Sequence, residues 1–228
     1  MFGWGKPRRP RAVAFDIIGT VFPLEPLRPL VTALGLPPAA LEGWFAAGLR
    51  DAFALSAAGG FAPLPEVLGG ALDQVLAEQG LPANPRGKAA LLDGMKRLAP
   101  RPDAQDAFET VAGAGMRIIA LSNGARAATQ ALLRRGRLDD LVAHVASVED
   151  VGMYKPRPEV YRHAVRMAGT RAGRVALVAV HPWDINGAKA AGLTTAFVSA
   201  GHSFTPVMRR PDVAAPTLAA AARALVAL

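Results

Sequence analysis

The feature that most constrains the fold of this 228-residue chain is an alternation of short apolar runs with helical patterns. The first apolar run covers residues 12–15 and ends at Asp16, and Gly19 and Thr20 follow at once. Similar runs recur at 116–121, 174–180 and 194–199, with a weaker one at 144–147. Helical patterns separate them, at 103–114, 125–135, 158–168 and 185–191. This alternation predicts an α/β fold, a Rossmann-like doubly wound parallel sheet with helices on both faces.

The alternation stops between Phe22 and about Pro100. Helical runs divided by Pro and Gly replace it, at 27–34, 39–54, 65–78 and 86–98. We therefore expect an α/β core made of residues 1–22 and 100–228, with a helical cap of residues 23–99 inserted after the first strand. Such a cap can close over a pocket and exclude water. The Ala-rich run at 216–228 predicts a terminal helix.

Composition narrows the class of protein. Hydrophobic residues make up 51% of the chain and charged residues 19%, which is typical of a globular protein. The absence of cysteine excludes disulfides, thiolate metal sites and a cysteine nucleophile. The formal charge of +8 comes mostly from scattered arginines, with clusters only at 6–11 and 134–137. This pattern favours a charged surface and a small anionic substrate over a nucleic-acid partner.

No apolar stretch reaches the roughly 18–20 residues that a membrane helix needs. The basic start of the chain is followed only by the short run that ends at Asp16, which is typical of a buried strand rather than of a signal peptide. We therefore expect a cytoplasmic protein with no membrane partner.

Polar side chains stand at the ends of the predicted strands, where parallel sheets bind ligands. Asp16 is ionised at neutral pH and can attack carbon or phosphorus without a base, or it can be a simple turn residue. Ser122 and Asn123, just before a helix, offer hydrogen bonds to an anionic group, or they cap that helix.

Two later segments add charge to the same edge. Lys155 stands between Tyr154 and Pro156 and can hold Asp16 ionised, or it can be a solvated lysine before a helix. Asp184 follows Trp183 and can pair with Lys155 and position water, or it can act as a helix cap. His181 and Trp183, taken alone, are more typical of hydrogen bonding and packing.

Asp16, Ser122, Lys155 and Asp184, in this order and with a helical insertion after the first, resemble the four motifs of the haloacid dehalogenase superfamily. The resemblance covers the chain from about Ala12 onward. Phosphatase members usually carry a second Asp where this chain has Ile18, and an additional acidic residue where it has Val180. Because Mg²⁺ prefers several oxygen ligands, we expect no metal and no other cofactor.

The segments around Ser122, Lys155, Tyr161 and Trp183 are similar to the metal-independent (S)-2-haloacid dehalogenases. The resemblance implies that Asp16 attacks the carbon that bears the halogen, and that water then hydrolyses the ester to a 2-hydroxy acid. It assigns catalytic roles to five residues, Asp16, Thr20, Ser122, Lys155 and Asp184. It places Asn123, Trp183, His181 and Tyr161 around the substrate, and it implies a homodimer.

Departures from that family concern the leaving group and the water. The family carries Tyr at the position of Ile18 and a halide-binding Arg where alignment on Trp44 places Phe45. Arg50, five residues further along the same predicted helix, is the candidate substitute, although an exposed arginine is the alternative. Ala179 and His181 replace a Ser and an Asn that handle water, and His181 can accept a proton in their place.

Three functions stay open at this stage. The first is a haloacid dehalogenase acting on a small anionic 2-substituted acid. The second is a phosphatase-like hydrolase with a reduced Mg²⁺ site. The third is a non-catalytic binding protein that has kept the fold.

Overall fold

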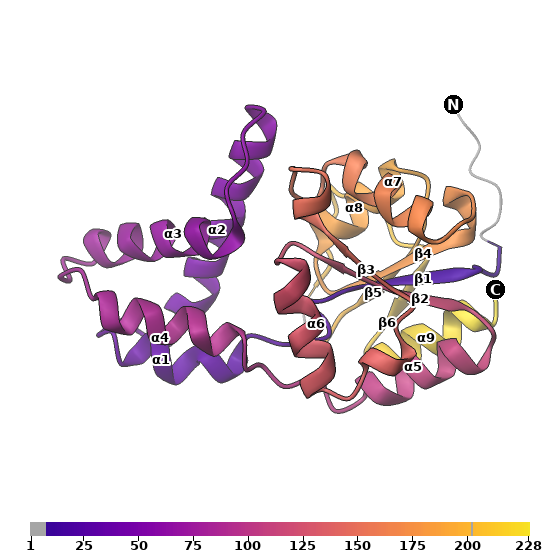
Figure 1. Cartoon of the computed structure of the whole chain (residues 1–228), viewed down its shortest axis with the longest axis horizontal. Coiled ribbons are helices and arrows are strands. Elements are labelled where there is room, and N and C mark those ends of the chain that lie inside the picture. The colour runs from indigo at the N-terminus through magenta and orange to yellow at the C-terminus, as the bar shows by residue number, and fades with distance from the viewer. Residues whose placement is uncertain (1–7, 202) are drawn as a thin grey trace.

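The computed structural model describes residues 8–201 and 203–228 of the chain, and its centre is a six-stranded sheet (Figure 1). The strand order is β3-β2-β1-β4-β5-β6, and every neighbouring pair is parallel. The first seven residues of the predicted 1–22 core segment, with Lys6 of the basic cluster, lie outside the described residues. The strands are β1 (Ala12–Asp16), β2 (Arg117–Ser122), β3 (His144–Ser147), β4 (Val175–Ala179), β5 (Thr194–Val198) and β6 (Val213–Ala215).

Helices cover both faces of this sheet, as the alternating pattern predicts. Figure 1 shows α5 and α9 on one face and α7 and α8 on the other. The helices of this part are α5 (Ala104–Gly113), α6 (Arg126–Arg135), α7 (Pro158–Met167), α8 (Pro182–Ala190) and α9 (Leu218–Val226). Short 3₁₀ turns lie between them at Asp139–Leu141, Val148–Asp150 and Ala172–Arg174. The prediction of a doubly wound α/β fold is confirmed.

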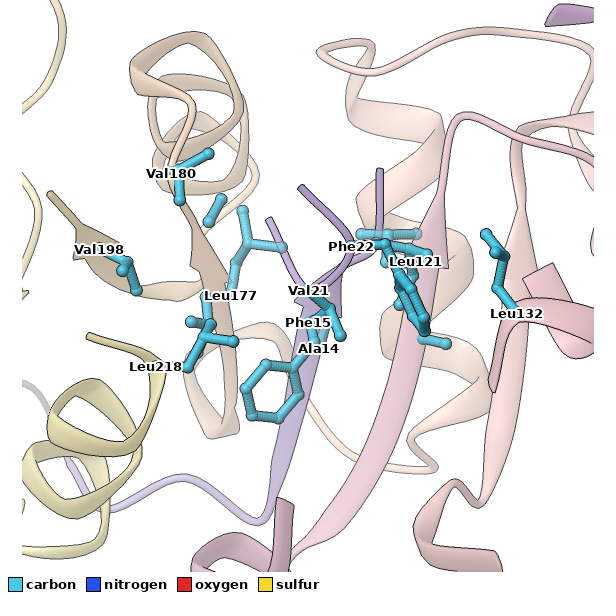
Figure 2. Packing of buried hydrophobic residues seen from close by; sticks show 14 of the residues in the cluster. Ala14, Phe15, Val21, Phe22, Leu121, Leu132, Leu177, Val180, Val198 and Leu218 are labelled. Atoms are coloured by element: carbon cyan, nitrogen blue, oxygen red, sulfur yellow. The ribbon is translucent and has the colours of Figure 1, made fainter. Parts of the chain in front are cut away.

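The core lies between the sheet and these helices. All five residues of β1 are buried, which explains why its sequence is an uninterrupted apolar run rather than an alternating one. Figure 2 shows Ala14, Leu121, Leu177 and Val198, side chains of four neighbouring strands, within one cluster. Phe15 stacks on Phe108 of α5 with ring centroids 4.5 Å apart, which joins the central strand to the helix layer.

Four helices follow β1 and lie to one side of the sheet in Figure 1. They are α1 (Arg28–Thr32), α2 (Ala40–Ala57), α3 (Leu64–Glu78) and α4 (Pro85–Met95), preceded by a 3₁₀ turn at Glu25–Leu27. Trp44 of α2 is fully buried, and its indole N–H donates to the Leu68 carbonyl of α3 at 2.9 Å. We refer to these four helices as the cap.

The structure adds one strand to the sequence prediction. β6 has three residues, of which only Ala215 is buried, so it carries no apolar run that a pattern would detect. None of the helices in the described part of the chain is both long enough and apolar enough to cross a membrane.

Candidate active site

The fold brings the predicted polar residues to one edge of the sheet. Asp16 ends β1 and pairs in register with Leu121 of β2, and Ser122 follows at the end of β2. β4 ends at Ala179 on the other side of β1, directly before the start of α8. Because parallel strands all end at the same edge, residues more than a hundred positions apart meet there.

Lys155 lies at the centre of this cluster. Its ammonium nitrogen is 2.6 Å from Oδ1 of Asp16 and 2.6 Å from Oδ2 of Asp184. The Lys155 and Asp184 side chains are fully buried, and the side chain of Asp16 is only 4% exposed. Tyr161 of α7 donates to the other oxygen of Asp184, Oδ1, at 2.6 Å. One ammonium thus bridges two carboxylates that are almost completely removed from water.

Burial and charge act against each other in this cluster. Burial opposes the charged form of Lys155, but the carboxylates of Asp16 and Asp184 outweigh it and raise the lysine pKa above its ordinary value. Burial raises the pKa of Asp184, and the ammonium of Lys155 partly offsets this effect. Burial is the largest cause of a Tyr161 pKa well above the usual value, and the charge of the adjacent Asp184 is the second. The Tyr161 hydroxyl therefore stays a proton donor. The lysine therefore keeps its positive charge beside Asp16.

The second oxygen of Asp16 is held by the loop that follows β1. Thr20 donates from its hydroxyl to Oδ2 of Asp16 at 2.5 Å and accepts from the N–H of Val180 at 3.1 Å. Both carboxylate oxygens of Asp16 are thus fixed before any substrate binds. The arrangement suits a nucleophile, because orientation is settled in advance.

Arg101, which the sequence analysis did not predict as a site residue, supports this loop through its backbone carbonyls. Its guanidinium donates to the carbonyls of Thr20 at 2.7 Å and Gly19 at 3.3 Å, and its own N–H donates to the Val21 carbonyl at 2.8 Å. These acceptors are backbone atoms, so no motif in the side chains signals the contact. The only sequence signal is the position of an arginine where the chain returns from the cap.

Ser122 and Asn123 lie in the cluster and shape the loops around Lys155. Oγ of Ser122 accepts from the N–H of Gly124 at 2.9 Å. The side-chain oxygen of Asn123 accepts from the backbone N–H of Lys155 at 3.1 Å. Asn123 therefore ties the lysine loop to the end of β2, and Ser122 closes the turn into α6.

Aromatic rings cover the cluster on the side of the cap. The His181 ring stacks on Trp183 with centroids 5.1 Å apart and an interplanar angle of 15°. Phe53 of α2 meets Trp183 edge-on at 5.1 Å, and Phe45 of α2 lies 6.3 Å from the His181 ring. The ammonium of Lys155 is 5.6 Å from the Trp183 ring centroid. The sequence predicted Trp183 and His181 here but not Phe53.

Arg50 is the predicted site residue that the structure does not bring to this cluster. Its guanidinium pairs with Asp51 at 2.8 Å and with Gln74 at 2.9 Å, and its side chain is 58% exposed. A separation of five positions turns a helical residue by about 140° from the first, so Arg50 and Phe45 face different sides of α2. The position facing His181 is filled by a phenyl ring and not by a cation.

The fold agrees with that of solved haloacid dehalogenases. L-2-haloacid dehalogenase from Xanthobacter autotrophicus superposes with a TM-score of 0.88 at 24% identity, over 96% of this chain and 99% of that one. The L-2-haloacid dehalogenase RSc1362 superposes with the same TM-score of 0.88 at 26% identity, over 96% of this chain and 98% of that one. The strand order and the cap after β1 therefore define an α/β fold of the haloacid dehalogenase type.

Comparison of the sequence with protein-family models and with known proteins identifies the family of this chain. The family model described as haloacid dehalogenase-like hydrolase matches residues 10–192, and the chain belongs to this family. Among curated relatives, (S)-2-haloacid dehalogenase from Pseudomonas sp. (strain YL) is 26% identical over 89% of this chain and 88% of that protein. (S)-2-haloacid dehalogenase 1 from Pseudomonas sp. (strain CBS-3) is 33% identical, but the match spans only 60% of this chain and 62% of that protein.

Proposed function

We propose that this chain hydrolyses the carbon–halogen bond of a small 2-haloacid, with Asp16 as the nucleophile and without a metal ion. The observation that carries the proposal is the ammonium of Lys155, held 2.6 Å from both Asp16 and Asp184 in a buried site. It places a positive charge against the Asp16 carboxylate and orients it where water is largely excluded, which is what displacement at a saturated carbon needs. The names of the relatives supply the substrate class.

The first step uses the charge of Asp16. A carboxylate oxygen attacks the carbon that bears the halogen, and the electron pair of the carbon–halogen bond leaves with the halide. Thr20 and Lys155 hold the two oxygens in place. The product of this step is an ester between Asp16 and the acid. In the second step water adds to Cγ of Asp16, and the ester is cleaved to the 2-hydroxy acid.

The phosphatase alternative needs a cation beside the nucleophile, and the residues there fit a cation poorly. Asp16 and the Ile18 carbonyl would have to hold such a cation, and the His181 imidazole already lies 3.3 Å from this carbonyl and 3.6 Å from Oδ2 of Asp16. Within residues 8–201 and 203–228, no group of three or more His, Cys, Asp or Glu side chains lies close enough to hold a metal ion. These residues favour a reaction that needs no metal ion.

Chloride release from each enantiomer of 2-chloropropionate, measured in the presence of EDTA, tests the proposal. We expect release from the S enantiomer, undiminished by EDTA, and none from the Asp16→Asn variant. The matched control is Asp51→Asn, which changes an aspartate that pairs with Arg50 on the cap. Absence of chloride release from the unmodified protein, with hydrolysis of phosphate esters in Mg²⁺, would favour the phosphatase alternative instead.

A further inference from the structure

His181 contacts the reacting carboxylate but has no part in the first step of the proposed reaction. Its Nε2 lies 3.6 Å from Oδ2 of Asp16 and 3.3 Å from the Ile18 carbonyl oxygen. Like Lys155, His181 places a side-chain nitrogen within 4 Å of the Asp16 carboxylate. The His181 side chain is 19% exposed, whereas those of Lys155 and Asp184 are fully buried, so water reaches the histidine most easily.

The ring of His181 is held in one orientation. It stacks on Trp183 at 5.1 Å, and its backbone carbonyl accepts from the N–H groups of Asp184 and Ile185 at the start of α8. Gly19 has a φ of +86°, and a Cβ at that residue would lie 2.7 Å from Nε2. The nucleophile loop thus leaves room for the imidazole nitrogen only because residue 19 is a glycine.

Asp184 is poorly suited to accept the proton of the hydrolytic water. Its Oδ2 is 2.6 Å from the ammonium of Lys155, and its Oδ1 accepts from the Tyr161 hydroxyl at 2.6 Å. Both oxygens of this fully buried carboxylate are therefore occupied by donors. Each of these oxygens already accepts a short hydrogen bond, so the main role of this carboxylate is to orient Lys155.

We propose that His181 carries the proton in the second step, the hydrolysis of the Asp16 ester. The inference rests on the proposed function. Nε2 takes a proton from the attacking water as the water oxygen bonds to Cγ of Asp16. The Cγ–Oδ2 bond then breaks, its electron pair goes to Oδ2, and Nε2 returns the proton to this departing oxygen. The second proton of the water leaves as Asp16 ionises again.

The geometry around Nε2 supports the transfer of the proton to the departing oxygen. A proton on Nε2 has two acceptor oxygens within 3.6 Å, Oδ2 of Asp16 and the carbonyl of Ile18. Oδ2 of Asp16, the carboxylate oxygen beside the histidine, is thus the one that receives the proton when the ester is cleaved. Oδ1 stays 2.6 Å from the ammonium of Lys155, which stabilises the negative charge that develops on it.

A rapid-quench reaction with excess (S)-2-chloropropionate tests the inference in the His181→Phe variant, because phenylalanine keeps an aromatic ring against Trp183 but transfers no proton. We expect a rapid release of about one chloride per protein, followed by turnover slowed by about a hundredfold. Mass spectrometry of the quenched variant would show the ester on the peptide that contains Asp16. The matched control is His163→Phe, at a histidine whose side chain is 18% exposed and pairs with Asp150 away from this site.

Each outcome separates the inference from the proposed function. If the variant hydrolyses the ester as fast as the unmodified protein, or if its chloride burst disappears, His181 does not carry the proton of the second step. If the unmodified protein releases no chloride, the proposed function is wrong, and so is this inference, which depends on it. Accumulation of the ester in His181→Phe, with normal turnover in His163→Phe, supports it.

Discussion

At the scale of single residues, Lys155 has the least ordinary position in the chain. A fully buried ammonium is costly unless its partners compensate, and Lys155 has two carboxylates at 2.6 Å. The carboxylates in turn depend on it, since Asp184 is fully buried and Asp16 nearly so. Lys155, Asp16 and Asp184 therefore stabilise one another, so replacing the lysine leaves the charges of the two carboxylates without compensation.

This dependence predicts how stability changes at high pH. The pKa of Lys155 is raised in the folded protein, so the unfolded chain releases the proton near the ordinary value of 10.5 while the folded chain keeps it. The free energy of unfolding therefore falls above about pH 10.5, by about 1.4 kcal/mol for each pH unit from this residue. We expect the fall to be shallower in Lys155→Met, measured by urea denaturation across this range. Parallel curves for the two proteins would contradict the prediction.

At the scale of elements, the nucleophile loop depends on a residue from a different segment. Arg101 donates to two carbonyls of the loop, and the loop presents the Thr20 hydroxyl to Asp16. Replacing Arg101 by Met leaves these carbonyls without their donor, at a cost of about 1–3 kcal/mol. We expect chloride release to slow through kcat, with KM for 2-chloropropionate little changed. Arg97→Met, an exposed arginine of the same connection, is the control and should behave as the unmodified protein.

The contact between α2 and α3 gives a second prediction at this scale. A Cβ at Gly48 would lie 2.4 Å from the Leu68 side chain, which is fully buried, whereas a Cβ at Gly43 of the same helix meets nothing within 4 Å. We expect Gly48→Ala to destabilise the protein by about 1–3 kcal/mol through overpacking. Gly43→Ala should stabilise it by up to about 1 kcal/mol, because alanine favours the helix. Thermal unfolding of the two variants measures both changes in stability. An equal change in the two variants would contradict the prediction.

The sequence predicted the fold, and the position of most candidate site residues, correctly where an apolar run defines a strand and a polar residue stands at its end. The runs ending at Asp16 and Ser122 are buried strands, and a parallel sheet must bring their ends together. It failed where contact depends on the direction of a side chain or on backbone atoms. Arg50 faces away from the cluster because of its angle on α2. Arg101 donates to backbone carbonyls, which every residue has, so no sequence pattern marks the contact.

At the scale of the whole molecule, the cap and the core meet through the segment that carries Lys155. The N–H of Tyr154 donates to the buried Oγ of Ser56 in α2 at 2.8 Å, and the Tyr154 hydroxyl donates to the Ala62 carbonyl at 2.7 Å. Phe61 stacks on the Tyr154 ring at 5.3 Å. The residue next to the central lysine is therefore anchored in the cap.

The charge of the whole molecule leads to the last prediction. A formal net charge of +8 attracts a 2-haloacid, which is an anion at neutral pH. Raising the ionic strength from about 0.01 M to about 1 M shortens the screening length from about 30 Å to about 3 Å. We expect kcat/KM for 2-chloropropionate to fall roughly tenfold over this range, mainly through KM. Inhibition by neutral lactamide should stay nearly constant while inhibition by lactate weakens. If lactate and lactamide respond alike to salt, the positive charge of the molecule has no role in capturing the substrate, and only contacts at the active site select an anion.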